Sequence, residues 1–146
     1  MGADIHIFAE FKAGDGPWTA HPNHTSDEDG HVDDIGGDRN YEVFGALAGV
    51  RGDGPDPKGL PDDITETVLN ASDMWDGDGH SHSYYSLAEF KKILKKTGNT
   101  NYSNSTFNAI NEHKKKLELD LKSEKILLGQ NINTKVEVRI VFFFDN

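Results

Sequence analysis

Apolar and polar residues alternate along the first stretch of the chain, from Ala3 to Phe11. One set of alternate positions is apolar and contains Ile5, Ile7, Ala9 and Phe11, and the other is mixed and contains Asp4, His6, Phe8 and Glu10. A repeat of two residues predicts a β-strand with one apolar face. The turn residues at 14–17 and the segment Trp18-Thr19-Ala20 then predict a short returning strand, which would complete a hairpin.

A second alternating stretch closes the chain, from Lys135 to Asp145. Val136, Val138 and Ile140 alternate with charged residues, and residues 141–144 are apolar at every position. Continuous apolar runs are typical of strands that are covered on both faces. We therefore predict that the first and last strands share one sheet.

Two short helices are predicted in the first half of the chain. Tyr41, Phe44 and Leu47 recur at helical spacing, which predicts a helix over 41–49 with Asp38 as its N-cap. Pro61 is suited to the start of a second helix, which would run through Leu69. The polar segment 21–38 and the Gly- and Pro-rich segment 52–61 are predicted to be loops.

Two further helices are predicted in the second half. The sequence Ser86-Leu87-Ala88-Glu89 has the pattern of a capping box and opens an amphipathic stretch over 87–97. Ser105 would cap a longer helix that ends near Gly129, although the leucines at 117, 119 and 121 also allow a strand there.

The order of these elements predicts an α+β fold. At 146 residues the chain suits one domain, residues 1–146. We expect a small, mostly antiparallel sheet that contains the N- and C-terminal strands and is packed by about three helices, near 41–49, 87–97 and 105–128.

Composition narrows the classes of function. No run approaches the roughly 18 apolar residues of a membrane span, so we expect no membrane partner and a cytoplasmic location. Because the chain has no cysteine, disulfides and thiolate chemistry are excluded, and a metal would need His and carboxylate ligands.

Charge is distributed unevenly. Residues 1–90 hold 4 Lys and Arg against 19 Asp and Glu, or −15, whereas residues 91–146 hold 11 against 6, or +5. An acidic surface repels a nucleic-acid backbone, so we expect no binding to duplex nucleic acid. The lysine groups at 91–96 and 114–116 are interpreted as solvated helix faces.

The densest group of chemically active side chains lies at 76–83, with the sequence Asp-Gly-Asp-Gly-His-Ser-His-Ser. Because it runs into the capping box at Ser86, we place it at a helix N-terminus, where free N–H groups favour anions. We name residues 76–83 the His-Ser block; its predicted ligand-binding residues are His80, Ser81, His82 and Ser83, together with Tyr84, which follows it. The alternative is that the serines cap the helix and the histidines lie in solvent.

The few Lys and Arg residues of the acidic part, residues 1–90, include a second group of candidate ligand-binding residues. Arg39 and Arg51 are two of the four cations in the acidic part of the chain, and they could bind ligand phosphates or pair with internal carboxylates such as Asp38 or Asp63. The further predicted ligand-binding residues are His6, Asn40 and Tyr41. Four aromatic residues could stack on a base or could belong to the core: Tyr41, Tyr84, Tyr85 and Trp75.

If the protein only binds a ligand, we expect it to need no cofactor. The many histidines and carboxylates nevertheless also allow a site for a divalent metal. The residues that would hold a divalent metal are Asp4, His6, Asp78, His80 and His82. Such a site could activate water for hydrolysis. The structural alternative is that His6 bonds a neighbour in the sheet.

Five blocks in order resemble a family of small, mostly uncharacterised proteins of bacteriophages and prophages: Met-Gly-x-Asp-Ile-His at 1–6, and residues 39–51, 59–63, 78–83 and 138–146. Members often carry Cys at the position of Ala3. The resemblance implies a phage protein in a bacterial host, and small phage proteins include some that counter host defences by acting on nucleotide immune signals.

Three functions follow as hypotheses. The first is a binding protein, a homo-oligomer, that sequesters a small phosphorylated nucleotide such as a cyclic ADP-ribose variant or a cyclic dinucleotide. The second is a metal-dependent phosphodiesterase that cleaves such a signal, so whether the protein is an enzyme stays open. The third is an acidic inhibitor of a host protein.

Overall fold

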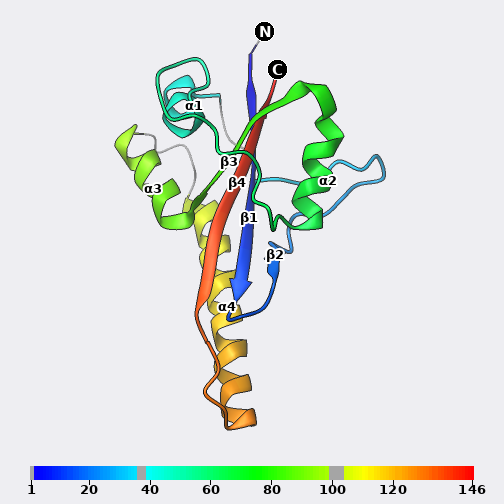
Figure 1. Cartoon of the computed structure of the whole chain (residues 1–146), viewed down its shortest axis with the longest axis vertical. Helices are drawn as coiled ribbons and strands as arrows, with labels where there is room; N and C mark the ends of the chain where they lie inside the picture. Colours follow the sequence, from blue (N-terminus) through cyan, green and yellow to red (C-terminus); the bar gives the residue numbers. More distant parts are fainter. Residues whose placement is uncertain (1, 36–38, 99–103) are drawn as a thin grey trace.

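Four strands form one antiparallel sheet in the order β2-β1-β4-β3 (Figure 1). The computed structural model describes residues 2–35, 39–98 and 104–146. The strands are β1 (Asp4–Ala13), β2 (Trp18–Ala20), β3 (Gly79–Ser86) and β4 (Val136–Asp145). β1 and β4 pair along their whole length, with Asp4 opposite Asp145. The predictions of an N-terminal hairpin and of a sheet shared by both chain ends are confirmed.

Helices cover both faces of this sheet (Figure 1). They are α1 (Tyr41–Ala48), α2 (Glu66–Trp75), α3 (Leu87–Lys96) and α4 (Asn104–Leu128), with a short 3₁₀ turn, η1 (Asp76–Asp78), after α2. The predicted α+β fold is therefore confirmed, and the stretch 117–121, where a strand was possible, is helical. None of the helices in the described part of the chain is long and apolar enough to cross a membrane.

Local capping decides where the helices begin. Asn40, not Asp38, caps α1, because its side-chain oxygen accepts the N–H groups of Glu42 and Val43; Asp38 lies outside the described residues. The helix predicted from Pro61 is wrong in its bounds, because Thr65 caps α2 by accepting the Val68 N–H. The capping box of Ser86 and Glu89 at α3 is confirmed. Helix α4 begins at Asn104, so Ser105 lies inside the helix and is not its N-cap.

Two hydrophobic cores lie on opposite faces of the sheet. The larger one packs the apolar set of β1, including Ile5 and Ile7, against α1, α3 and α4. The smaller one packs Phe8 and Phe143 against Val68 of α2. Both faces of β1 are therefore buried. We call the face of the sheet that packs against α2 the α2 face; His6 lies on it because His6 and Phe8 are two positions apart in the strand, and such residues point to the same side.

Loop 21–35 covers the free edge of β1 beside this α2 face. The Ile7 N–H donates to Asp34 Oδ2 at 3.2 Å, and the Ile35 N–H donates to the Ile7 carbonyl at 2.8 Å. His24 also binds this edge, since its Nε2 accepts the Ala9 N–H at 2.9 Å. Because an edge strand leaves backbone groups unpaired, these bonds hold the loop next to His6.

A β-bulge in β3 fixes the position of the His-Ser block. The pairing with β4 passes from His80 opposite Phe144 to Ser83 opposite Phe142, so Ser81 and His82 together oppose Phe143. Ser81 has a positive φ of 56°, which is unusual for a residue other than glycine. The predicted position at a helix N-terminus is therefore wrong for this block: residues 76–78 form η1, residues 79–83 are strand, and Ser86 is the residue that lies at the start of α3.

Candidate functional site

Three rings from three neighbouring strands form a row on the α2 face. Phe143 of β4 lies between His6 of β1 and His82 of β3, with ring centroids 5.2 Å apart on each side and interplanar angles of 29° and 27°. Trp75, at the end of α2, lies over His6 at 4.6 Å. The structure thus brings His6 and His82, two of the predicted ligand-binding residues, to one surface.

His6 is held between two carboxylates. Its Nδ1 lies 3.2 Å from Asp34 Oδ2 and its Nε2 lies 2.5 Å from Asp145 Oδ2, and 19% of its side chain is exposed. Burial opposes protonation of this ring, but the hydrogen bonds and negative charges of Asp34 and Asp145 outweigh it and raise the pKa of His6. The arrangement therefore favours an imidazolium that is oriented at both nitrogens.

Replacing Asp145 by asparagine should lower the pKa of His6, because one of the two charges that stabilise the imidazolium is removed. A raised pKa contributes stability that is fully present below about pH 6.5 and is lost as the pH rises through the folded-state pKa. NMR titration of the imidazole protons measures the change. Asp33→Asn is the control, since Asp33 lines the same cavity without bonding His6; an equal drop there would contradict the assignment.

A cavity of about 490 Å³ opens beside His6, between β1, loop 21–35 and α2. Its apolar lining residues include Phe8 and Trp75, and its polar lining residues include His31, Asp33 and Asp34. A pocket of this size suits a small ligand, and its mixture of aromatic rings with a few converging polar groups is typical of binding sites. The wall offers hydrogen-bond acceptors and ring faces.

The rest of the His-Ser block is divided between the two faces of the sheet. His82 Nε2 lies 2.9 Å from Ser72 Oγ of α2, and burial followed by the charge of His80 lowers the pKa of His82. His80 instead stacks near Phe144, a residue of the larger core, and contacts Ser81 and Asn146.

Ser83 and Tyr84 are also separated from His6. Ser83 is buried and accepts the Lys58 N–H at 3.1 Å, which is a structural role in holding loop 52–61 against β3. Tyr84 lines a different hollow, at the end of β3, and the Lys58 amine lies 5.0 Å from its ring. The His-Ser block therefore contributes one residue, His82, to the surface around His6.

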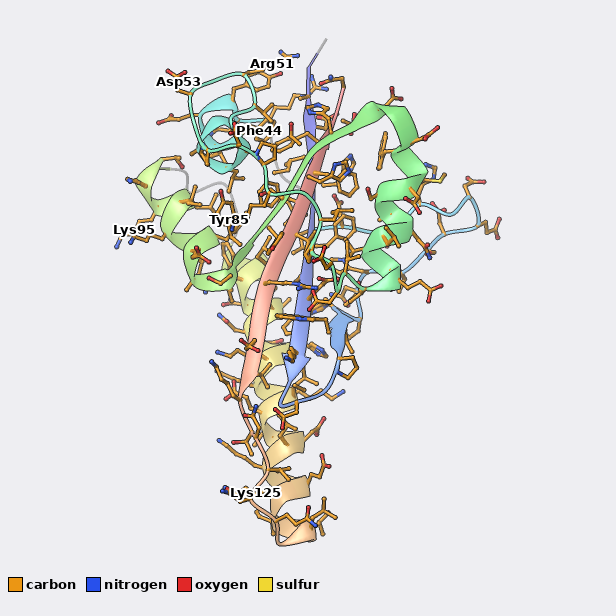
Figure 2. The ribbon with its side chains drawn as sticks, in the orientation of Figure 1. Phe44, Arg51, Asp53, Tyr85, Lys95 and Lys125 are labelled. Atoms are coloured by element: carbon orange, nitrogen blue, oxygen red, sulfur yellow. The ribbon has the colours of Figure 1, made fainter. Side chains whose placement is uncertain are left out.

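The residues predicted at 39–51 form a separate group around α1. Arg39 pairs with Asp4 through bonds of 2.7 and 3.1 Å, which keeps the pKa of Asp4 low. Asn40 is used as the α1 cap, and the Arg51 guanidinium lies 4.9 Å from the Tyr41 ring. Figure 2 shows Arg51 in the loop beside α1, across the strands from α2. None of this group lines the cavity beside His6.

The residues predicted as metal ligands do not come together as one set. Asp4 is bound to Arg39, His6 lies between two carboxylates, and His80 and His82 occupy different faces. Asp78 is exposed in η1.

Within the described residues, the group that has metal-ligand spacing is Asp27, Asp29 and His31, all exposed in loop 21–35. Its compactness follows from a turn in which Asp27 Oδ1 accepts the N–H groups of the other two residues.

Three residues around His6 and His82 were missed by the sequence reasoning: Asp34 and Asp145, which contact His6, and Ser72, which contacts His82. Trp75 was named only as one of several aromatic residues that could stack on a base. Strand parity alone could have indicated Asp145, because it shares the face of Phe143 in β4. Comparisons of the chain with protein-family models, with curated proteins and with solved structures found no match.

Proposed function

We propose that the chain binds and sequesters a small nucleotide-derived signal, with the cavity beside His6 as the site. The observation that carries this proposal is one cavity whose lining combines the Trp75 ring, which lies over the His6 imidazole, with Asp33 and Asp34. As a phage protein, the chain would counter host defence by removing a cyclic ADP-ribose variant or a cyclic dinucleotide.

The chemistry of the wall favours the base of such a ligand. The half-buried Trp75 ring offers a stacking surface, and carboxylates accept the amino and imino N–H groups of purines and cytosine. Phosphates would be repelled by Asp33 and Asp34. We therefore place the base inside the cavity and the phosphates at its exposed side, towards His31.

The hydrogen bonds of His6 favour binding of the nucleotide over its cleavage. A histidine that transfers a proton needs a ring nitrogen within reach of the ligand. Here Asp34 and Asp145 occupy both nitrogens. The alternative, a metal-dependent phosphodiesterase, is less favoured because its predicted ligands lie in different places.

Replacing Trp75 by leucine should weaken the binding of such a nucleotide by about fivefold or more, since stacking on an aromatic side chain contributes about 1–3 kcal/mol per base. Titration calorimetry with a panel of cyclic dinucleotides and ADP-ribose derivatives measures this loss. Arg51→Gln is the matched control and should leave the affinity unchanged, because Arg51 lies beside α1.

Three outcomes contradict the proposal, two of this titration and one of mass spectrometry on the ligand that heat denaturation releases. The first is no binding tighter than about 0.1 mM, which is roughly 5.5 kcal/mol. The second is a loss with Arg51→Gln but not with Trp75→Leu, which would move the site to α1. The third is a bound nucleotide that returns with a new mass after heat denaturation, which would make the protein an enzyme.

The homo-oligomer and the cytoplasmic location in a bacterial host belong to the same proposal. Light scattering of the purified chain tests the oligomer, and a mass equal to one chain would contradict it. Several apolar side chains at the far part of α4 are exposed: Leu119, Ile126, Leu127 and Leu128. This part of α4 extends beyond the sheet (Figure 1).

A further inference from the structure

A second hollow, of about 710 Å³, lies at the other end of β4 from His6. It forms where β3 stops: the last β3–β4 pair is Ser86 with Arg139, whereas β4 continues to Val136 beside β1. The chain turns into α3 at Leu87, and α4 lies against the same end of the sheet. The result is a groove between the start of α3, one side of α4 and residues 135–139, which we name the lysine groove.

Three lysines from three different segments line the lysine groove. They are Lys91 of α3, Lys114 of α4 and Lys135, which precedes β4. Among the residues that the structure describes, none of the three lies within ion-pair distance of a carboxylate. The one carboxylate in the lining is Glu137.

The fourth cation of the lining, Arg139, is paired with two carboxylates, Glu10 and Asp63, so it adds no net positive charge. The hollow is therefore locally positive, in a chain whose net charge is −10.

The neighbouring lysines behave differently. Lys92, Lys95, Lys96, Lys115 and Lys116 are exposed and do not line the groove, as expected of the solvated helix faces predicted from the sequence. Lys91 and Lys114 are half-buried, and the Lys91 amine lies 5.1 Å from the Phe107 ring. Of the lysines at 91–96 and 114–116, Lys91 and Lys114 therefore line the groove, and Lys135 is the third lysine of its lining.

Aromatic side chains complete the lining. Trp18 and Tyr84 both border the groove, and each is half-buried. The start of α3 at Ser86 and Leu87 adds the positive end of a helix dipole to the lysine charges. Phosphate groups and a ring system could thus be bound together.

We propose that the lysine groove binds a small phosphorylated molecule with two or more negative charges, of the class of nucleoside diphosphates. Its volume lies within the range of small-ligand pockets. A long nucleic acid is disfavoured, because the strongly acidic remainder of the surface would repel its backbone. This proposal does not rest on the function proposed for the cavity beside His6, since the two hollows share no lining residue.

The test is titration calorimetry of the full chain with ADP and with pyrophosphate, using two matched double variants. Lys91→Ala with Lys114→Ala removes two groove lysines, and Lys92→Ala with Lys115→Ala removes the same charge from the adjacent exposed positions. We expect the first pair to weaken binding of ADP at least tenfold and the second to change it less than twofold. Lys135→Ala, at an exposed position, should weaken binding even if the first pair unfolds the chain.

Several results would overturn the proposal. Equal weakening by the two double variants would show attraction to overall charge, and no binding of either probe tighter than about 1 mM, roughly 4.1 kcal/mol, would show that no such site exists. Loss of ADP binding in Trp75→Leu, with the groove variants unchanged, would assign the nucleotide to the cavity beside His6 alone. A short single-stranded oligonucleotide that binds more tightly than ADP, with the same dependence on Lys91 and Lys114, would replace the small molecule by a nucleic acid.

Discussion

Replacing Arg139 by methionine should lower the free energy of unfolding by about 3–5 kcal/mol, because it leaves a buried carboxylate without its counter-charge. The Glu10 side chain is 0% exposed and that of Arg139 is 9% exposed, and Arg139 Nε donates to Glu10 Oε1 at 2.7 Å. Once the guanidinium is gone, the bond that remains to Glu10 is the one from the Thr65 N–H.

The same guanidinium joins three further groups. It donates to the Asp63 side chain at 2.7 Å and to the Asp63 carbonyl at 3.1 Å, and it lies 3.9 Å from the centre of the Trp18 ring. Arg139 therefore connects β4 to β1, to β2 and to the segment before α2. The Asp63 side chain is largely exposed, so we assign most of the effect to Glu10.

Urea denaturation at pH 7, followed by tryptophan fluorescence, measures this loss. Adding Glu10→Gln to Arg139→Met should restore part of the stability, since the uncompensated charge is then removed. The surface pair offers a control: Arg39→Met breaks only the exposed ion pair with Asp4 and should change the stability little. A loss below about 1 kcal/mol in Arg139→Met would contradict the stabilising role assigned to the Arg139–Glu10 pair.

Acidification from pH 7.5 to 5 should destabilise the fold through His24. This histidine is buried, its Nδ1 donates to the Asp33 carbonyl at 2.8 Å, and its Nε2 accepts the Ala9 N–H at 2.9 Å. Because Nε2 must stay unprotonated to accept, the neutral ring is required. Burial, followed in the same direction by the charge of His21, lowers the pKa of His24, although the bond to Asp33 opposes this shift.

The direction in which stability changes with pH follows from how many protons the folded and the unfolded chain bind. Below about pH 6.5 the unfolded chain protonates His24 whereas the folded chain does not, so stability falls by up to about 1.4 kcal/mol per pH unit until the folded-state pKa is reached. His6 acts in the opposite direction, because its pKa is raised and its contribution is lost as the pH rises. Comparison of the wild type with a His24 variant separates the contribution of His24 to the pH dependence from that of His6.

Urea denaturation of the wild type and of His24→Gln at several pH values tests this prediction. The variant should be less stable at pH 7.5, where it loses a fitted neutral ring, and its stability should fall less steeply between pH 6.5 and 5. Carboxylates with lowered pKa, such as Asp4 and Asp63, titrate below this window and should not obscure it. Parallel profiles for the two proteins would show that His24 does not set the acid sensitivity.

Much of the secondary structure could be predicted from local patterns. The two-residue repeats of β1 and β4 identified both strands and the shared sheet, and the Ser86 capping box identified the start of α3. The starts of two helices were predicted less accurately, because more than one nearby residue could begin the helix. Asn40 rather than Asp38 caps α1, and α2 begins after Thr65 rather than at Pro61. In these cases several residues of similar propensity lie within a few positions of each other.

The candidate site was predicted less completely. His6 was identified, but its partners Asp34 and Asp145 lie 28 and 139 positions away in the chain. The His-Ser block was recognised as chemically active, yet its strand conformation comes from pairing with the apolar β4 and its bulge from the register of that pairing. No local pattern at 79–83 contains that information.

By itself, the sequence determined the α+β class, the two terminal strands and the faces on which Ile5, His6 and Phe8 lie, because backbone periodicity fixes side-chain direction within each element. Only the tertiary structure decided which charges meet. The register of β1 with β4 set Asp145 against His6, and the edge bonds of loop 21–35 brought Asp34 to the same ring. The end of β3 similarly gathered Lys91, Lys114 and Lys135 in one groove. Contacts between distant segments depend on strand register and packing, which local patterns do not encode.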